Sequence, residues 1–304
     1  MEKVITVKNL KKQYGKEIAV EDVNFELDKG NIMGLLGPNG AGKTTTLKMI
    51  TNLCLKDEGK VVIGGVSMDD DAKNALSKVG AALDIPSFYN ELTAEENLEC
   101  FARLHRESSK KQVMELLDYV GLTGQEKKKV KNFSLGMKQR LALARAMLGE
   151  PKLIILDEPA NGLDPQGMLW LYNMIHNMAK ERKITFIVSS HLLHDMEGLC
   201  TDVLILNRGK SILQGKTTEI LSEVTDMVDC IIEETQEFES MLLHVSGIKM
   251  IRKQENNYTV RLESISFDEF IKKIVERNMH IIYISLRRNT LQDLFLKMTG
   301  GLGV

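Results

Sequence analysis

The stretch NIMGLLGPNGAGKTT, residues 31–45, decides the fold. It begins as a short apolar run, passes into a glycine-rich turn and ends in a helical pattern. Within it, residues 37–45 match the spacing GxxxxGK(S/T), which marks a phosphate-binding loop when a strand precedes it and a helix follows. Glycines let backbone N–H groups converge on an anion, and the helix N-terminus adds its dipole. We therefore predict a nucleotide phosphate site; the alternative is a tight strand–helix turn without a ligand.

Three further apolar runs predict a parallel sheet. KLIILDE (152–158), ITFIVSS (184–190) and DVLILN (202–207) are short and almost continuously apolar, as strands covered on both faces are. A helical pattern at residues 166–181 separates the first two. Strands that alternate with helices indicate an α/β domain with a mainly parallel sheet.

The N-terminal part of the chain adds two other patterns. Residues 1–27 alternate apolar and polar side chains, which predicts antiparallel strands. Residues 85–150 carry apolar side chains at three- and four-residue spacing, which predicts a mostly helical subdomain. We expect residues 1–220 to form one domain.

The pattern changes after about residue 220. Residues 221–304 contain four strand-like and three helical segments in the order β-α-β-β-α-β-α. The first six match the ferredoxin-like split βαβ arrangement. We expect a small α+β accessory domain here, and its sequence shows no cluster of ligand-like side chains.

Composition and charge limit the function. Of the 304 residues, 43% are hydrophobic and 27% are charged, and the formal net charge is −2. This balance does not indicate a nucleic-acid-binding surface, so no nucleic-acid partner is expected. No apolar stretch has secretory or membrane-spanning length, so a role at a membrane needs a partner. The four cysteines form no CxxC pair, which favours reduced thiols in a cytosolic protein.

Charged side chains follow two of the predicted strands, which should be neighbours. Asp157 ends the first and is expected beside the phosphate loop, where it can hold Mg²⁺ with the Thr44 hydroxyl. Glu158 is placed to orient or deprotonate an attacking water, and Lys43 to reach the β- and γ-phosphates. His191 follows the second strand and can contact the γ-phosphate. An Asp-Glu pair alone is more often a solvated surface, but with the loop upstream it predicts hydrolysis.

Two other residues have both a structural and a ligand-binding interpretation. Tyr14 precedes the phosphate loop and can either stack on an adenine ring or pack within a strand. Ser134, in FSLGM (133–137), precedes a helical pattern, as a residue that caps its own helix does. The alternative is that Ser134 serves a ligand held elsewhere.

In this order the motifs resemble those of the nucleotide-binding subunit of an ATP-binding cassette (ABC) transporter. The resemblance implies a P-loop NTPase fold of the ABC ATPase type, with a RecA-like α/β core, an antiparallel β subdomain and a helical signature subdomain. It also implies ATP hydrolysis coupled to transport. The matching segments are Tyr14, the Walker A loop 37–45, the signature 134–138, the Walker B strand 153–158, the D-loop 161–165 and the switch residue His191.

The resemblance suggests an answer for Ser134. In this family two subunits pair head-to-tail, and ATP lies between the Walker A loop of one and the signature helix of the other. One chain carries one set of motifs, so a homodimer with two ATP sites is implied. Mg²⁺ would be held by Thr44, Asp84 and Asp157. The nucleotide would be held by Tyr14, Gly37, Pro38, Asn39, Gly40, Ala41, Gly42, Lys43, Thr44, Thr45, Ser134 and Gly136, with Glu158, His191 and Lys43 as catalytic residues.

The chain departs from the family pattern at three positions. Leu135 and Met137 replace a glycine and the glutamine of the common signature LSGGQ, and Asp84 replaces the glutamine of the Q-loop. An aspartate there could still coordinate the metal. These features resemble the bacitracin-export and lantibiotic-immunity branch of bacterial ABC exporters, which removes peptide antibiotics from the membrane.

The same resemblance implies partners. Polytopic membrane permease subunits would bind after the Q-loop, where Phe88 and Tyr89 either contact them or pack within the helical subdomain. Residues 221–304 resemble the C-terminal extension of such exporters. The chain would lie in the cytoplasm, peripheral on the inner face of the cell membrane. Two other functions stay open: a soluble ABC-family ATPase acting on ribosomes or DNA, and an ATP-sensing regulatory module with little turnover.

Overall fold

The chain forms two compact units, Met1–Thr217 and Thr218–Val304. The computed structural model describes residues 2–83, 87–105, 109–191, 196–222, 227–233, 235–287 and 290–298. The boundary expected from sequence, after residue 220, falls within the short helix α8 (Thr217–Ser222). None of the helices in these described ranges combines the length and apolar character that a bilayer span requires.

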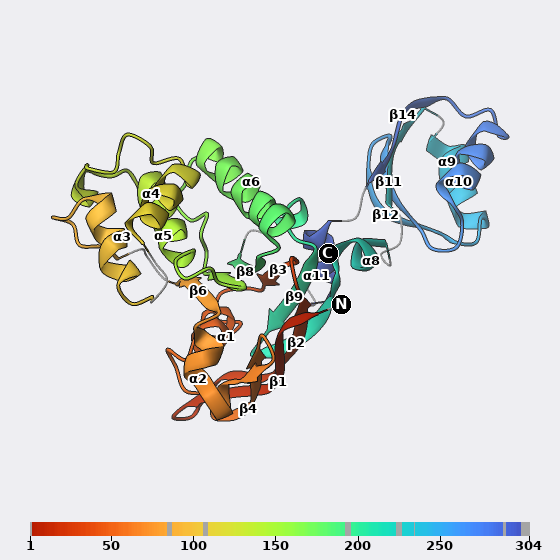
Figure 1. Cartoon of the computed structure of the whole chain (residues 1–304). Helices are drawn as coiled ribbons and strands as arrows, with labels where there is room; N and C mark the ends of the chain where they lie inside the picture. Colours follow the sequence, from red (N-terminus) through yellow and green to blue (C-terminus); the bar gives the residue numbers. More distant parts are fainter. Residues whose placement is uncertain are drawn as a thin grey trace. The chain divides into compact units, whose positions relative to one another are not determined.

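A ten-stranded sheet is the framework of the first unit (Figure 1). Its strands are β1 (Lys3–Tyr14), β2 (Glu17–Asp28), β3 (Ile32–Leu36), β4 (Glu58–Ile63), β5 (Val66–Ser67), β6 (Val79–Ala82), β7 (Leu153–Leu156), β8 (Thr185–Ser190), β9 (Asp202–Asn207) and β10 (Lys210–Lys216). They lie in the order β5-β4-β1-β2-β10-β9-β3-β8-β7-β6.

The middle of this sheet is parallel, as the apolar runs predicted. β3 pairs in parallel with β8 and β9, and β7 pairs in parallel with β6 and β8. Every residue of β3, β7 and β8 is buried, because the sheet is covered on both faces there. All these strands run the same way, so the loops that follow β3, β7 and β8 open at one edge of the sheet. That edge carries the phosphate loop, the acidic pair and His191.

The alternating N-terminal segment forms the expected antiparallel strands. β1 pairs with β2 and with β4, and β4 pairs with β5. Inward-facing side chains of β1 and β2 are buried with those of β4 in the core of this unit, whereas the intervening side chains are more exposed. The pattern follows from a sheet with one solvated face.

Seven helical segments complete the first unit within its described residues up to residue 182. Capping side chains explain where four of these helices begin. Thr93 forms a capping box with Glu96. Ser109, Ser134 and Asp164 each accept a backbone N–H from the residue three positions further on, and Pro165 follows Asp164 as the first residue of its helix. The segments are α1 (Lys43–Ile50), α2 (Met68–Leu76), α3 (Ala94–Ala102), α4 (Lys110–Tyr119), the 3₁₀ turn η1 (Val130–Asn132), α5 (Leu135–Ala146) and α6 (Pro165–Arg182).

The second unit has a four-stranded antiparallel sheet in the order β12-β13-β11-β14. Each strand–helix–strand connection skips over one intervening strand, which is the split βαβ topology. Three rings, Phe238, Tyr258 and Phe270, are fully buried at its centre, with Phe238 edge-on to both others. The elements are β11 (Met227–Ile232), α9 (Thr235–His244), β12 (Ile248–Gln254), β13 (Asn257–Leu262), α10 (Phe267–Val275), β14 (Ile281–Arg287) and α11 (Leu291–Met298).

Candidate functional site

The turn between β3 and α1 surrounds a cavity of about 360 Å³. The carboxyl ends of the parallel strands bring residues from three distant segments to it, which is where ligands bind in open α/β sheets. The cavity joins most of the residues predicted from sequence. Its lining is Pro38, Asn39, Gly40, Ala41, Gly42, Lys43, Thr44, Thr45, Glu158, Asn161 and His191.

Backbone geometry in the loop requires glycine at position 42. Gly42 has φ 97°, in the left-handed region, and a Cβ there would lie 2.6 Å from the carbonyl oxygen of Ala19. The residue that follows, Lys43, is buried, and its Nζ donates to the carbonyls of Gly37 at 2.8 Å and Pro38 at 3.3 Å. The loop thus folds around its own lysine.

Burial lowers the pKa of the Lys43 ammonium, and the carboxylates of Glu158 and Asp157 oppose this. Lys43 Nζ lies 3.9 Å from Glu158 Oε1. A buried cation held by backbone carbonyls is placed to exchange them for the oxygens of an anionic ligand. The chemistry of the cavity therefore fits a polyphosphate.

Asp157 lies beside the phosphate loop, as the strand pattern predicted. Thr44 Oγ1 donates to Asp157 Oδ2 at 2.8 Å, and the other carboxylate oxygen, Oδ1, accepts from Ser189 Oγ. Ser189 Oγ in turn accepts the backbone N–H of Glu158 at 2.8 Å. The buried Ser189 hydroxyl thereby ties the two acidic residues to β8, the neighbouring strand.

Glu158 is held from two directions. Its backbone has φ 47°, a left-handed conformation that is uncommon outside glycine. Its side-chain Oε2 lies 2.7 Å from His191 Nδ1. The turn after β7 thus aims the carboxylate across the cavity at His191 rather than along the strand.

Ser189 was not predicted from the sequence, and Asn161, the first residue of the D-loop, was given no role at the phosphate site. Asn161 lines the cavity, and the Ser189 hydroxyl is hydrogen-bonded to both Asp157 and Glu158. Ser189 lies in a buried, otherwise apolar strand, where a hydroxyl needs a partner. The paired serines at the end of ITFIVSS were the available signal.

Replacing Ser189 by alanine should lower kcat for ATP hydrolysis about tenfold, because it removes a hydrogen bond to a charged group and frees the Glu158 turn. The KM for ATP should change little, since the phosphate loop keeps its contacts. Thr185→Val is the matched control: it also removes a buried, hydrogen-bonded hydroxyl from β8, yet far from the acids. Steady-state kinetics that show equal losses in both variants would contradict the assignment.

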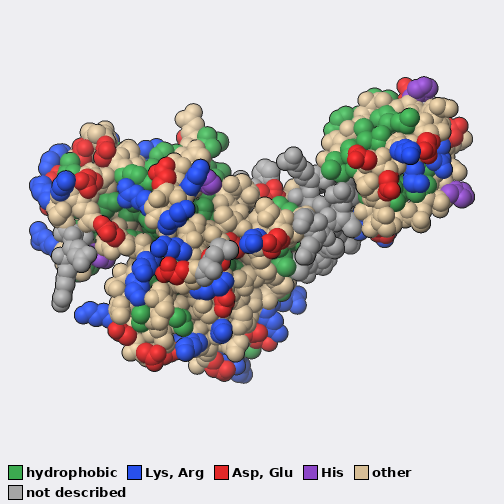
Figure 2. Space-filling model, turned by 45° about the vertical axis from the view of Figure 1, so that its right-hand side comes forward, with side chains coloured by type: hydrophobic (Ala, Val, Ile, Leu, Met, Phe, Trp, Pro, Cys, Tyr) green, Lys and Arg blue, Asp and Glu red, His purple; other side chains and the backbone are tan. Residues whose placement is uncertain are grey.

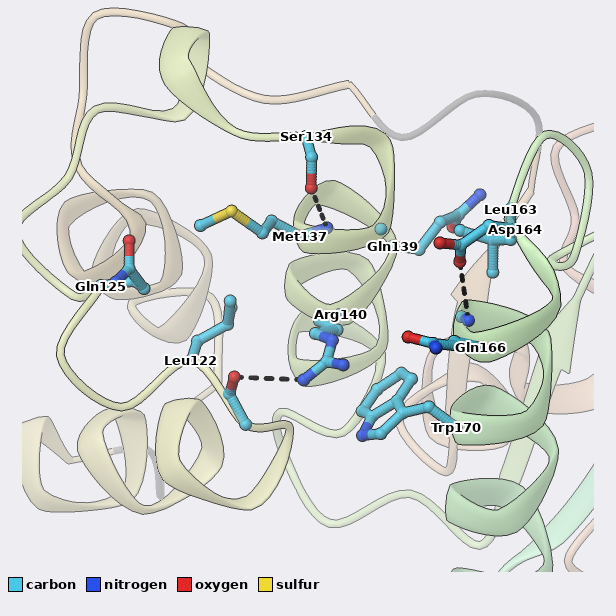
Figure 3. Close-up of a pocket in the computed structure, with 13 residues that line it drawn as sticks. Leu122, Gln125, Ser134, Met137, Gln139, Arg140, Leu163, Asp164, Gln166 and Trp170 are labelled. Atoms are coloured by element: carbon cyan, nitrogen blue, oxygen red, sulfur yellow. Dashed lines mark hydrogen bonds between the residues drawn. The ribbon is translucent and has the colours of Figure 1, made fainter.

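The second cavity, of about 450 Å³, lies between α5 and α6 (Figure 3). Ser134, Gly136 and Met137 line it at the start of α5, and Arg140 and Trp170 line it further along α5 and α6. The Arg140 guanidinium stacks 4.1 Å from the centre of the Trp170 ring and donates to the Gly121 carbonyl at 3.2 Å. This contact joins the helical subdomain to α6.

Ser134 is a helix cap within its own chain. Its Oγ accepts the Met137 N–H at 3.3 Å at the start of α5 (Figure 3). Neither Ser134 nor Gly136 is among the residues that line the phosphate cavity. The two sets of residues assigned to ATP by sequence analysis therefore line two different cavities.

Tyr14 ends β1 with 52% of its surface exposed. Its hydroxyl lies 3.0 Å from Cys54 Sγ. This hydrogen bond is the main cause of a raised pKa of the Tyr14 phenol, and desolvation is the second cause. Tyr14 does not line the phosphate cavity. The Lys12 Nζ lies over the Tyr14 ring, 5.3 Å from its centre. Packing therefore accounts for about half of the surface of Tyr14.

Of the remaining sequence candidates, Asp84 lies outside the described residues. Phe88 stands 5.1 Å beneath the guanidinium of Arg145, on α5. The ring of Tyr89 stacks on Phe101 at 6.4 Å yet is 59% exposed. Phe88 thus packs within the helical subdomain, and Tyr89 has one free side.

Sequence comparisons identify the relatives of the chain. A model of the ABC transporter family matches residues 20–161. The uncharacterised ABC transporter ATP-binding protein YhcH of Bacillus subtilis is 35% identical over 301 residues, covering 99% of this chain and 97% of that protein. The bacitracin transport ATP-binding protein BcrA of Bacillus licheniformis is 35% identical over 311 residues, covering 99% of each. The lantibiotic transport ATP-binding protein SrtF of Streptococcus pyogenes is 38% identical over 211 residues, covering 69% and 90%.

Solved structures of ABC transporter ATP-binding proteins have a similar fold. An ATP-binding subunit of an ABC transporter superposes with a TM-score of 0.65 at 27% identity, over 90% of this chain and 99% of that one. The dimeric ATP-binding cassette MJ0796, in a post-hydrolysis state bound to ADP and phosphate, gives 0.63 at 26% identity, over 70% and 98%. The chain therefore belongs to the family of ABC transporter ATP-binding proteins, and it is an ATPase.

Proposed function

We propose that the chain is the motor subunit of a bacterial exporter, in which two copies close on ATP and drive separate membrane permease subunits. One observation carries the proposal. Lys43, Thr44 and Glu158 line one cavity, whereas Ser134 and Gly136 line another. A chain with both halves of an ATP site in separate cavities needs a second copy, arranged head-to-tail, to join them.

In the joined site, backbone N–H groups of residues 39–45 and the N-terminus of α1 bind the phosphates of ATP. Glu158 accepts a proton from a water molecule that attacks the γ-phosphorus, and the bond to the β,γ-bridging oxygen breaks to leave ADP and phosphate. Lys43 compensates the charge that develops on the leaving oxygen. His191 Nδ1, 2.7 Å from Glu158, holds the carboxylate and can contact the γ-phosphate.

The donor set fits Mg²⁺. Thr44 Oγ1, which lines the phosphate cavity, and the neighbouring Asp157 carboxylate are hard oxygen ligands 2.8 Å apart. No cluster of three or more His, Cys, Asp or Glu side chains fit for a metal occurs among the described residues, as suits an ion that keeps waters and binds mainly through substrate phosphates. Bound there, Mg²⁺ would neutralise charge on the β- and γ-phosphates. Asp84 is proposed as a third ligand.

Across the interface, Ser134 and Gly136 would meet the γ-phosphate with the N-terminal dipole of α5. Leu135 is 40% exposed beside them. An apolar side chain replaces a glycine there, so we expect closure of the pair to bury this leucine against the partner. Tyr14 would stack on the adenine.

The named functions of relatives support transport. BcrA, which matches 99% of the chain, is named for bacitracin transport, and SrtF, which matches 69% of it, for lantibiotic transport. We propose peptide antibiotics as the exported class and a position at the inner face of the membrane, held by the permease. The free side of Tyr89 is the proposed contact. A soluble ATPase acting on ribosomes or DNA and a sensor with little turnover are less well supported, because the relatives that match end to end are transport proteins.

The test is a purification of tagged Glu158→Gln protein from detergent-solubilised membranes of its native host, with Mg-ATP present. We expect a polytopic membrane protein in stoichiometric yield, named by mass spectrometry. A parallel purification of Lys43→Ala, which should not hold ATP, controls for adsorption. Recovery of Glu158→Gln with ribosomal proteins, or with nothing, would refute the exporter.

A further inference from the structure

The four-stranded sheet of the second unit has two edges, and one of them is protected. β12 carries Lys249, Arg252 and Lys253, all exposed, and its register with β13 shifts between Met250 and Arg252. Cationic side chains and irregular register are the means by which edge strands avoid pairing with other chains. A second copy of this edge would also be repelled by its own charge.

The other edge, β14, has the opposite character. Residues 281–286, IIYISL, contain no charged side chain. Ile282 is 57%, Tyr283 52% and Leu286 39% exposed, and hydrophobic side chains gather on the visible face of this unit (Figure 2). The register with β11 is regular from Tyr283 onward, and no strand in the described ranges pairs with the outer side of β14. Its backbone groups there are open to another strand.

We propose that β14 pairs antiparallel with β14 of a second copy, which joins two four-stranded sheets across a two-fold axis. Identical strands that pair antiparallel close into a dimer and leave no further edge for growth, because β12 is charged. With the two-fold axis at Ile284, Ile282 would lie opposite Leu286 of the second copy and Tyr283 opposite its Ser285, with no like charge opposed. A second copy is the occupant to expect, since the proposed function, on which this inference rests, already brings two copies together.

The consequence concerns the ATPase cycle. After hydrolysis the nucleotide interface opens, and separate copies would drift apart. A contact between the second units would keep both copies at high effective concentration, so that reclosure on new ATP becomes intramolecular. The pair would then be constitutive, and only the nucleotide interface would open and close.

Sedimentation velocity on the full chain without nucleotide tests this. We expect a dimer whose dissociation constant rises at least about tenfold in the Ile282→Lys/Leu286→Lys variant, since each substituted position then places a lysine opposite a lysine of the second copy. Met250→Lys, which adds a lysine to the already charged β12, is the matched control and should leave the dimer intact. Amide exchange of residues 283–286 should slow as the wild-type concentration rises through the dimerisation range.

A second experiment distinguishes a failure of the β14 interface from a failure of the proposed function. In the Glu158→Gln background with Mg-ATP, the double-lysine variant should still form the nucleotide-dependent dimer, which also shows that it is folded. A wild-type chain that stays monomeric without nucleotide, or a dimer that survives both lysines, overturns the β14 interface. A nucleotide-free dimer without any ATP-dependent one would instead refute the ATP-sandwich proposal and leave β14 standing.

Discussion

Replacing Glu158 by glutamine is expected to lower ATP turnover at least about a hundredfold, because the amide cannot accept a proton from the attacking water. ATP affinity should be kept or increased. The loop contacts of Lys43 and Thr44 are unaffected. A neutral amide replaces the carboxylate that lies 3.9 Å from Lys43 Nζ, so the lysine charge is no longer shared with Glu158. The variant should therefore accumulate an ATP-bound dimer. A phosphate-release assay measures turnover, and the amount of ATP that stays with the protein through size-exclusion chromatography measures the accumulated ATP-bound dimer.

The control for this prediction is Glu181→Gln, an exposed change near the end of α6 that should leave turnover unchanged. Residual turnover above a tenth of wild type in Glu158→Gln would mean that another group activates the water. His191 is the next candidate, since its ring faces the same cavity. A variant that neither hydrolyses nor binds ATP would point instead to a collapsed phosphate loop.

The largest loss of stability is expected from Gly80→Ala. Gly80 lies in β6, at the edge of the ten-stranded sheet, where the end of α5 packs on it. An added Cβ would overlap the carbonyl oxygen of Ala146, which is backbone and cannot rotate away. Overpacking of this kind costs about 3 kcal/mol. The midpoint of urea unfolding of the first unit should fall accordingly.

Gly198→Ala is the matched control, because a Cβ there meets no atom within 4 Å. Its effect should stay within about 0.5 kcal/mol. Gly80→Ala should also reduce ATPase activity, since α5 carries Ser134 at its start and would be displaced. Equal midpoints for the two variants would show that α5 does not pack on β6 as described.

β6 and α2 show what the sequence did not predict. VGAA in β6 has too few bulky apolar side chains to mark a strand, yet small residues are what the close approach of α5 requires. α2 begins at MDDDAKNAL, where the polar first turn hides the helical period. The sequence did contain a helix-start signal, a serine followed by three aspartates. In the structure Ser67 is the N-cap and accepts the Asp69 N–H, and the aspartates occupy the first turn.

By itself, the sequence determined the phosphate loop, the parallel strands and the order of motifs. These depend on local chemistry: glycines where φ must be positive, a lysine at the head of a helix, and apolar runs that only burial can satisfy. Tertiary structure decided which groups meet. Ser189 reaches Asp157 from another strand, and the left-handed turn at Glu158 aims its carboxylate at His191. Ser134 lines a different cavity from Lys43, because α5 packs beside α6 rather than over the loop. Contacts between segments far apart in the chain arise only once the sheet has set the strand order, so no local pattern encodes them.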